Sequence, residues 1–272
     1  MEFRSRGMDS LPPVVKNLLI INGLFFLATK MLPNLQIDLY SIFGLYYWES
    51  PNFKVWQFVT HMFMHGNTMH LFSNMFSLWM FGTIIENFLG SKRFLIFYIV
   101  CGLGASLLHL GVISYEFHVL KSAIAAFDHN PTYKEFASLL TQNSINNPGF
   151  LKFKADWANN PMSSDFSNAA SVGLHQWYNS LINEPTVGAS GAVFGILFAF
   201  GYLFPNTELM LLFIPFPIKA KYLVGLYALF ELYAGISNAA DDNIAHFAHL
   251  GGMLFAFIIL KIWNKNNRTH FY

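Results

Sequence analysis

Six long apolar stretches constrain this chain more than any other feature of its sequence. A helix that spans a bilayer needs about 20 mostly apolar residues. Stretches of this kind lie at 17–36, 68–89, 94–114, 187–204, 222–238 and 245–263. The composition agrees, because 54% of the residues are hydrophobic and only 11% are charged, against about 25% charged in a typical soluble domain. The sequence predicts an all-α polytopic membrane protein with six transmembrane helices.

The remaining composition excludes several classes of function. The formal net charge is +1 and no block of basic residues occurs, so nucleic acid is not an expected partner. The single cysteine, Cys101, rules out an internal disulfide framework and a multi-cysteine metal site. Its neighbours are apolar, which indicates a buried, inert thiol. We expect no cofactor and no metal, and the sequence makes no prediction of the oligomeric state.

The lysines and arginines predict the orientation of the chain in the membrane. With the N-terminus inside, ten of the 16 lysines and arginines lie on the inner side, and only Lys30 and Lys54 lie in short outer loops. We therefore expect a cytoplasmic N-terminal segment, 1–16, and a cytoplasmic tail, 265–272. No small-residue cleavage site follows the first apolar run and no transit peptide is evident, so a bacterial-type cytoplasmic (plasma) membrane is the expected location.

Two outer segments divide the membrane helices into blocks at 17–114 and 187–264. The first outer loop, 37–67, is rich in tyrosine, tryptophan and phenylalanine, which favour the membrane–water interface. We expect this loop to be membrane-associated. The second segment, 115–186, is predicted to be a mainly helical extramembrane insertion between the third and fourth spans. Helix-like spacing of its apolar residues, interrupted by Asn-Pro turns, occurs at 117–127, 132–143 and 164–182.

Polar side chains inside a span are costly, so each is a functional candidate. His70 and Asn74 are four residues apart, on one face of the second span near its outer end. Two side-chain donors on one face could hold a developing oxyanion. Hydrogen bonding between helices is an equally good explanation of an isolated pair.

Two further clusters contain a hydroxyl and two imidazoles. Ser190 opens the fourth span between Gly188 and Gly191, and such small residues more often indicate tight helix packing than chemistry. His246 and His249 begin the sixth span and are followed by two glycines, Gly251 and Gly252, that allow another helix to approach closely.

The predicted topology brings these clusters to one depth. The second, fourth and sixth spans all run inward from the outer side, so His70, Ser190 and His249 all lie near the outer surface. A serine hydroxyl needs an adjacent base to become nucleophilic. No carboxylate is obviously placed as a third member, because Asp242 lies about 10 Å from His249 along the helix. A Ser–His dyad is the simplest prediction.

At this point the sequence resembles the rhomboid family of intramembrane serine proteases. Three motifs carry the resemblance, and they occur in the family's order: HGNTMHLFSN, GASGAVFG and AHLGG. Glu86 in FGTIIENFLG also resembles the end of the family's second span. The similarity covers about 16–112 and 186–264 and leaves out the insertion. It implies a rhomboid-like bundle of six transmembrane helices that cleaves transmembrane segments of proteins within the lipid bilayer, with substrates entering beside the fifth span.

The resemblance implies a role for each matching residue. Ser190 would be the nucleophile and His249 the general base, with His70, Asn74 and the Ser190 backbone N–H forming the oxyanion hole. His65 would support the first outer loop, and Phe194 could stack on His249. The small residues Gly188, Gly191 and Gly252 would support the site. Gln57 stands where the family often has arginine after tryptophan, which places the anchoring of the loop, and not the chemistry, in question.

Other functions remain as alternatives. A metal enzyme using His61 and His65, or His246 and His249, is disfavoured because Glu86 and Glu231 are expected to lie elsewhere. For Glu231 we expect a structural hydrogen bond. A catalytically inactive rhomboid-like protein that binds or escorts membrane helices is the main alternative. A transporter is disfavoured, because no pair of broken-helix repeats is seen. The insertion lies on the active-site side and could select substrates.

Overall fold

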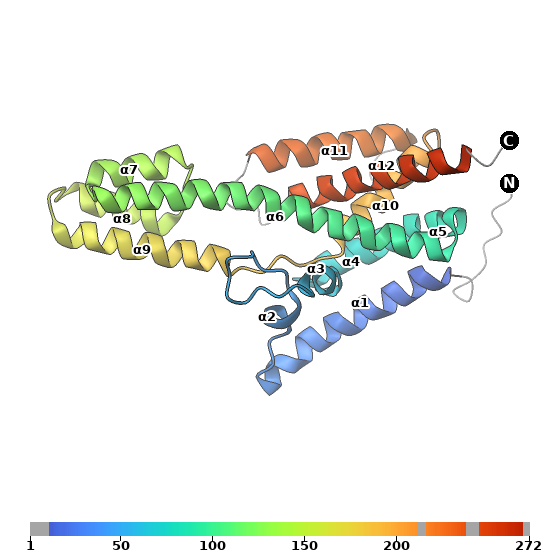
Figure 1. Cartoon of the computed structure of the whole chain (residues 1–272), viewed down its shortest axis with the longest axis horizontal. Helices are drawn as coiled ribbons and strands as arrows, with labels where there is room; N and C mark the ends of the chain where they lie inside the picture. Colours follow the sequence, from blue (N-terminus) through green and yellow to red (C-terminus); the bar gives the residue numbers. More distant parts are fainter. Residues whose placement is uncertain (1–10, 211–215, 238–244, 269–272) are drawn as a thin grey trace.

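The computed structural model describes residues 11–210, 216–237 and 245–268 of the 272-residue chain. Helix α6 (Ser91–His129) is 39 residues long and runs along the whole molecule (Figure 1). It joins a block of apolar helices at one end to a smaller helical bundle at the other. The described ends of the chain, in α1 and α12, point to the same end of the apolar block (Figure 1).

The apolar block contains the helices expected to lie in the membrane. These are α1 (Pro13–Met31) with the 3-10 turn η2 (Leu32–Leu35), α4 (Thr68–Ser77), the π-helical segment η4 (Leu78–Gly82), α5 (Thr83–Leu89), α10 (Ser190–Leu203), α11 (Ala220–Ser237) and α12 (His246–Arg268). Two short antiparallel strands, β1 (Glu208–Leu209) and β2 (Ile218–Lys219), pair Glu208 with Lys219 and Leu209 with Ile218.

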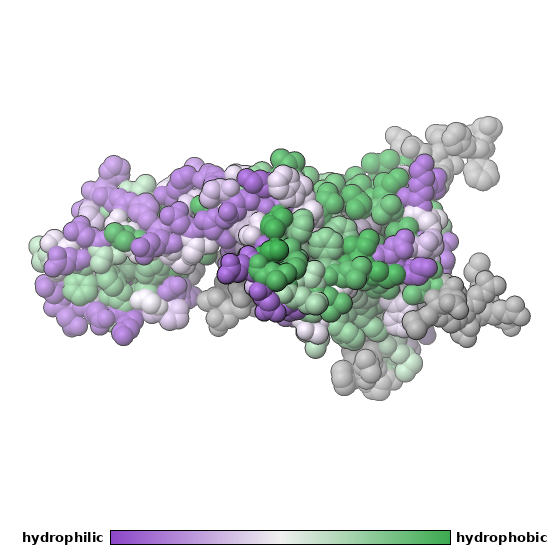
Figure 2. All heavy atoms as spheres, turned by 90° about the horizontal axis from the view of Figure 1, so that it is seen from below, coloured by the Kyte–Doolittle hydropathy of each residue, from purple (hydrophilic) through white to green (hydrophobic). Residues whose placement is uncertain are grey.

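Among the described residues, three helical runs are long and apolar enough to cross a membrane: Pro13–Leu35, part of Ser91–His129, and His246–Asn264. The protein is therefore a helical integral membrane protein. The surface supports this, because hydrophobic side chains cover the block around α1 and hydrophilic side chains gather on the distant bundle and at the opposite end (Figure 2). Helix α10 is apolar but shorter, so the count of six spans stays a prediction.

The observed boundaries differ from the predicted ones at two spans. The first helix begins at Pro13, not at residue 17, because proline fits the first turn of a helix. The third helix does not end at residue 114 but continues to His129. The helix expected at 117–127 is therefore present, but it forms the end of α6 and is continuous with the third helix. The second span is helical from Thr68 to Leu89, with the π-helical segment inside it.

The insertion is a helical bundle with its own hydrophobic core. The end of α6 packs with α7 (Tyr133–Gln142), α8 (Pro148–Ala158) and α9 (Ser164–Ile182). The helices expected at 132–143 and 164–182 are confirmed as α7 and α9, but α8 was not predicted. Its Asn-Pro-Gly start looks like a turn, whereas the Asn147 side chain accepts a hydrogen bond from the Phe150 N–H at 3.2 Å and caps the helix.

The first outer loop connects the two parts of the molecule. It contains α2 (Leu39–Phe43), α3 (Gln57–Thr60) and the 3-10 turn η3 (His61–Phe63). Its residues Leu45 and Tyr47 belong to the core of the bundle. The loop therefore packs against the insertion, so the insertion lies beside the segments that form the site described below.

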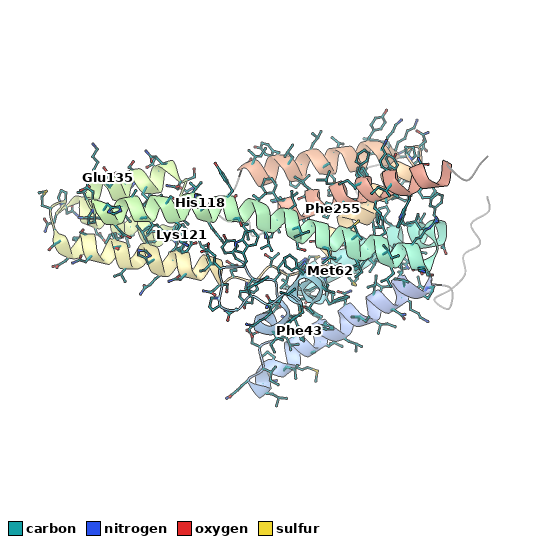
Figure 3. The ribbon with its side chains drawn as sticks, viewed as in Figure 1. Phe43, Met62, His118, Lys121, Glu135 and Phe255 are labelled. Carbon is teal, nitrogen blue, oxygen red and sulfur yellow. The ribbon has the colours of Figure 1, made fainter. Side chains whose placement is uncertain are left out.

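Two glycines allow α6 to pack closely on both sides. Gly102 and Gly104 are two residues apart, so they face nearly opposite sides of the helix. The Met62 side chain of the first loop occupies the space beside Gly102, and the Phe255 ring of α12 occupies the space beside Gly104 (Figure 3). A side chain at either glycine would collide with these residues, so α6 acts as the scaffold for both the loop and α12.

A buried carboxylate holds the start of α1 in place. Glu86, at the end of the second span, is 2% exposed. It accepts hydrogen bonds from the backbone N–H groups of Val14 at 3.0 Å and Val15 at 2.8 Å, and from the Ser91 hydroxyl at 2.7 Å. The first N–H groups of a helix lack intrahelical partners and favour negative charge. Glu86 therefore joins α1, α5 and α6.

We predict that Trp157→Ala destabilises the bundle by about 3–5 kcal/mol, because it leaves a cavity in the core. Trp157 is fully buried, and its ring packs against Phe136, Phe153 and Phe166. Met162→Ala is the matched control, since Met162 in the same bundle is 94% exposed. Urea unfolding followed by proteolysis of the bundle measures both variants. Equal stability of the two variants would contradict this description of the core.

Candidate active site

A buried amide joins several segments of the first outer loop. Gln57 is completely buried and joins backbone groups from three parts of the loop. Its side-chain oxygen accepts from the N–H groups of Lys54 at 3.0 Å and Tyr46 at 3.4 Å, and its nitrogen donates to the carbonyls of Asn52 at 3.0 Å and Ile42 at 3.5 Å. An amide both donates and accepts, so it satisfies all four groups. Gln57 thus anchors the loop at the position where the family often has arginine.

The loop is joined to the segment that leads into α10. Leu45 and Thr186 exchange backbone hydrogen bonds at 2.9 and 2.8 Å. The Gly188 N–H donates to the His61 carbonyl at 3.0 Å, and His109 of α6 lies 3.0 Å from the Thr186 hydroxyl. These contacts fix the backbone immediately before Ser190.

Helices α10 and α12 approach each other through backbone atoms. A side chain on Gly252 of α12 would collide with the carbonyl of Gly191 in α10. A side chain on Gly191 would collide with Ala105 of α6 and would lie 3.4 Å from the Ala248 carbonyl oxygen. One turn further along α10, the rings of Phe194 and His249 are stacked, with centroids 4.0 Å apart and planes 9° apart. The expected stack is therefore present.

Ser190 is the first residue of α10, and His70 lies beside it. Gly188 has a backbone φ of +134°, a conformation that residues other than glycine rarely adopt. A Cβ atom there would lie 2.8 Å from the His70 ring and 3.6 Å from Ser190 Oγ. The structure thus brings together His70, Ser190 and His249 from α4, α10 and α12. Among the described residues, Ser190 and His249 share no hydrogen bond, and such contacts are often long before substrate binds.

Within the part of the chain that the structure describes, the first backbone N–H groups of α10 have no hydrogen-bond partner. Its first intrahelical hydrogen bond runs from the Val193 N–H to the Ala189 carbonyl at 3.0 Å. The N–H groups of Ser190, Gly191 and Ala192 precede this bond, and the positive end of the helix favours an anion at this point. A developing oxyanion near Ser190 Oγ would meet these donors.

Two other residues of the motif HGNTMHLFSN, Asn74 and His65, lie next to His70. The Asn74 side-chain nitrogen donates to the His70 carbonyl at 3.0 Å, and Asn74 is 4% exposed. An amide nitrogen carries two hydrogens, so one remains for another acceptor. His65 contacts the His70 ring edge to face, with centroids 5.0 Å apart. Its backbone carbonyl accepts a 2.8 Å hydrogen bond from the Tyr40 hydroxyl, which holds the end of the first loop.

The Glu231 carboxylate, which was expected to lie away from the two histidines of α12, is part of this site. Glu231 of α11 is 3% exposed, and its Oε2 atom lies 2.8 Å from His249 Nδ1 and 2.6 Å from His246 Nδ1. The expectation that Glu231 falls away from these histidines was wrong, and the expectation of a hydrogen bond was right. The signal in the sequence was a charged residue inside the fifth span, which needs a partner. Asp242 lies outside the described residues.

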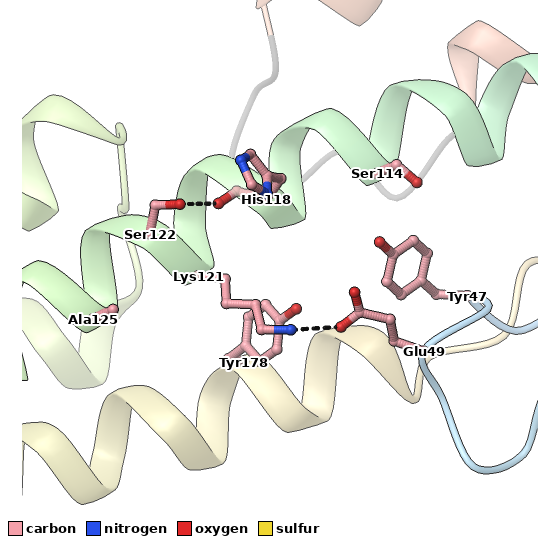
Figure 4. Close-up of a pocket in the computed structure, with 8 residues that line it drawn as sticks. All are labelled: Tyr47, Glu49, Ser114, His118, Lys121, Ser122, Ala125 and Tyr178. Carbon is pink, nitrogen blue, oxygen red and sulfur yellow. Dashed lines mark hydrogen bonds and ion pairs between the residues drawn. The ribbon is translucent and has the colours of Figure 1, made fainter.

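A surface pocket further along α6 is a less suitable site. It lies between α6, α9 and the first loop and contains two serines and a histidine (Figure 4). Its Ser122 hydroxyl donates to the His118 backbone carbonyl at 2.8 Å, not to an imidazole. Lys121 and Glu49 form an exposed ion pair at 2.8 Å across its edge. The pocket therefore lacks a hydroxyl paired with a base.

Comparison with known proteins agrees with the motifs. A family model described as the rhomboid domain matches residues 52–124 and 162–265. The chain is 25% identical over 233 residues to an uncharacterized mitochondrial rhomboid protein of Schizosaccharomyces pombe, covering 84% of this chain and 55% of the relative. It is 25% identical over 250 residues to the mitochondrial Rhomboid protein 1 of Saccharomyces cerevisiae, covering 84% and 53%.

A shorter match is to the rhomboid protease GlpG of Salmonella choleraesuis, with 37% identity over 51 residues, or 19% of this chain and 18% of the relative. The chain spans about half the length of the two fungal relatives. Both are named as mitochondrial proteins, which does not agree with the bacterial-type plasma membrane expected from the sequence.

The two buried loop histidines predict how stability depends on pH. Burial lowers the pKa of His61 to about 4, although its Nδ1 lies 2.8 Å from the Gln57 carbonyl. Burial and the neighbouring His70 lower the pKa of His65 to about 4. Below the unfolded pKa of about 6.5, the unfolded chain binds more protons than the folded one. Stability should therefore fall as the pH drops from about 6.5 to about 4 and then level off.

The unfolding midpoint of the protein in detergent, measured between pH 7 and pH 4, tests this dependence. His61→Gln should make the curve less steep, because it removes one of the buried imidazoles that take up a proton on unfolding in this pH range. The control is His118→Gln, which removes an exposed imidazole and should leave the slope unchanged. If the unfolding midpoint changes with pH by the same slope in all three proteins, His61 does not have the lowered pKa assigned to it.

Proposed function

Since the chain belongs to the rhomboid family, we propose that it is an intramembrane serine endopeptidase that cleaves transmembrane segments of membrane proteins. The observation that carries the proposal is the stack of Phe194 on His249 at 4.0 Å. Phe194 is four residues after Ser190, so both side chains lie on one face of α10. The stack supports a Ser190–His249 pair, because it packs the imidazole on the helix face that carries the hydroxyl.

In the proposed reaction, His249 removes the proton of the Ser190 hydroxyl as Oγ attacks the substrate carbonyl carbon. The resulting imidazolium gives the proton to the leaving amine as the C–N bond breaks. A water molecule then loses a proton to His249 and attacks the acyl-enzyme, which releases the carboxylic acid and restores Ser190. All groups that move a proton belong to this chain, so no cofactor or metal is required.

The oxyanion of the tetrahedral intermediate would be held by the side chains of His70 and Asn74 and by the Ser190 backbone N–H. This assignment is supported by the position of His70 beside Gly188 and by the unpaired donors at the start of α10. Loss of one oxyanion donor typically lowers kcat by about 10²–10³-fold. His65 and Gln57 would keep the first loop in place above these donors.

The proposed arrangement in the membrane follows the sequence prediction of six spans with both termini on the inner side. The catalytic groups then lie near the outer surface, where water can reach them, and the bundle of α7, α8 and α9 stands outside the bilayer on the same side. Substrate helices enter beside α11 and unwind locally, because the carbonyls of an intact helix are already hydrogen-bonded. Membrane fractionation would distinguish a bacterial-type plasma membrane from a mitochondrial one.

We predict that Ser190→Ala and His249→Ala abolish cleavage of a transmembrane substrate in proteoliposomes, because each removes a group that the chemical step needs. Asn74→Ala should lower kcat by about 10²-fold or more. The control is Ser106→Ala in α6, whose buried hydroxyl donates only to the backbone carbonyls of Gly102 and Leu103 at 3.0 Å. Cleavage products resolved by mass spectrometry give both the rate and the cleaved bond.

Two results would overturn the proposal. If the wild-type chain binds transmembrane helices without cleaving them, it is the inactive rhomboid-like protein considered above. If cleavage survives Ser190→Ala and stops when a metal chelator is added, the reaction depends on a metal instead of on the serine.

A further inference from the structure

One carboxylate oxygen binds two imidazoles at the outer end of α11 and α12. Glu231 Oε2 lies 2.6 Å from His246 Nδ1 and 2.8 Å from His249 Nδ1. The side chains of all three residues are nearly inaccessible, with exposed fractions of 4% for Glu231, 6% for His246 and 9% for His249. Since His249 is the general base of the proposed function, this carboxylate bears directly on its chemistry.

The packing of α11 directs Glu231 toward the site. Tyr227, one turn before Glu231, contacts the ring of Phe194 edge to face, with centroids 6.1 Å apart. Gly235, one turn after it, lets α12 approach, because a Cβ atom there would lie 3.1 Å from Phe247 and 3.3 Å from His246 Cβ. Residues four apart share one face of a helix, so this face of α11 covers the imidazoles.

The geometry determines which nitrogen of His249 carries hydrogen. An ionised carboxylate can only accept hydrogen bonds, so each Nδ1 at hydrogen-bonding distance from Oε2 must donate. In a neutral imidazole with hydrogen on Nδ1, the lone pair is on Nε2. Nε2 is then the atom free to take the Ser190 proton. When it does so, the imidazolium and the carboxylate form a buried ion pair, which stabilises the charge that develops during the reaction.

A metal ion held by the same three atoms is a poorer fit to these distances. Two ligand atoms bound about 2.0–2.1 Å from one tetrahedral zinc ion lie roughly 3.3 Å apart. The two Oε2–Nδ1 distances are 2.6 and 2.8 Å, which suit short hydrogen bonds to a charged group.

We propose that Glu231 is a positioning residue for the general base, so that this chain uses a Ser190–His249–Glu231 triad in which His246 is a second donor that holds the carboxylate. The proposal rests on the proposed function of Ser190 and His249. Glu231 does not touch the substrate; it acts through His249 by fixing the imidazole's tautomer and orientation and by balancing its positive charge.

The test is steady-state cleavage of a transmembrane substrate by Glu231→Gln, Glu231→Asp and the wild type in proteoliposomes. The amide is close in shape to the carboxylate but has no charge, and its NH₂ group can donate to Nδ1, which favours the wrong tautomer. We expect kcat to fall by about 10²-fold or more with little change in KM, since loss of the acid in serine protease triads costs up to about 10⁴-fold. Glu231→Asp keeps the charge and should recover part of kcat.

Glu86→Gln is the matched control. It makes the same chemical change at a carboxylate that is similarly buried and also accepts hydrogen bonds, at the start of α1. Thermal unfolding in detergent is measured for every variant, so that kcat is compared among folded proteins. We expect Glu86→Gln to lower the unfolding temperature while leaving kcat of the folded protein near the wild-type value.

The outcomes separate this inference from the proposed function. If the wild type cleaves its substrate and folded Glu231→Gln has the same kcat, the triad is wrong while the serine protease stands. If Glu231→Gln and Glu86→Gln lose activity only in proportion to their stability, Glu231 is merely structural. If a chelator stops the wild type and zinc restores it, the cluster is a metal site. If the wild type shows no cleavage, both proposals fail.

Discussion

The backbone contact between α10 and α12 is the constraint on which the candidate site depends. Gly191 and Gly252 face each other with no side chain between them, so the two helices come closer than ordinary side-chain packing allows. Only at this separation can the ring of Phe194 lie flat on that of His249. Helix α6 supports the contact, because Ala105 fills the space beside Gly191 and Gly104 makes room for Phe255.

Buried carboxylates serve two different purposes in the apolar block. Glu86 satisfies the N–H groups at the start of α1 and so joins three helices at one end. Glu231 meets two imidazoles at the other end. Both obey the rule that a buried charge must be matched by donors. The two carboxylates differ in their partners. The amide N–H groups bound by Glu86 cannot change their charge near neutral pH, whereas the imidazoles bound by Glu231 can. Glu231 can therefore influence a proton transfer.

Much of this arrangement could be predicted from the sequence, and the failures have physical causes. Apolar length and motif spacing located the helices that carry His70, Ser190 and His249. The end of α6 was misplaced because the helix continues beyond its apolar stretch, and no glycine or proline between residues 112 and 129 interrupts it. Helix α8 was missed because Asn147 and Pro148 suit a turn and a helix start equally well.

Glu231 shows most clearly what could not be predicted from the sequence. Its place inside an apolar span indicated that it needed a partner, but pairing depends on how far α11 is rotated and on how closely α12 approaches at Gly235. Those are properties of three-dimensional packing, not of spacing along one helix. Gln57 is a similar case, because its four hydrogen bonds join segments of the loop whose relative positions only the folded chain defines.

The central claim is that Ser190 is a nucleophile activated by His249. It is tested most directly by treating the purified protein with a fluorophosphonate probe and locating the adduct by mass spectrometry. We expect a phosphonylated Ser190 in the wild type and no adduct in His249→Ala, because the hydroxyl then has no base to accept its proton. An unmodified Ser190 in the wild type, or equal labelling when the imidazole is absent, would contradict it.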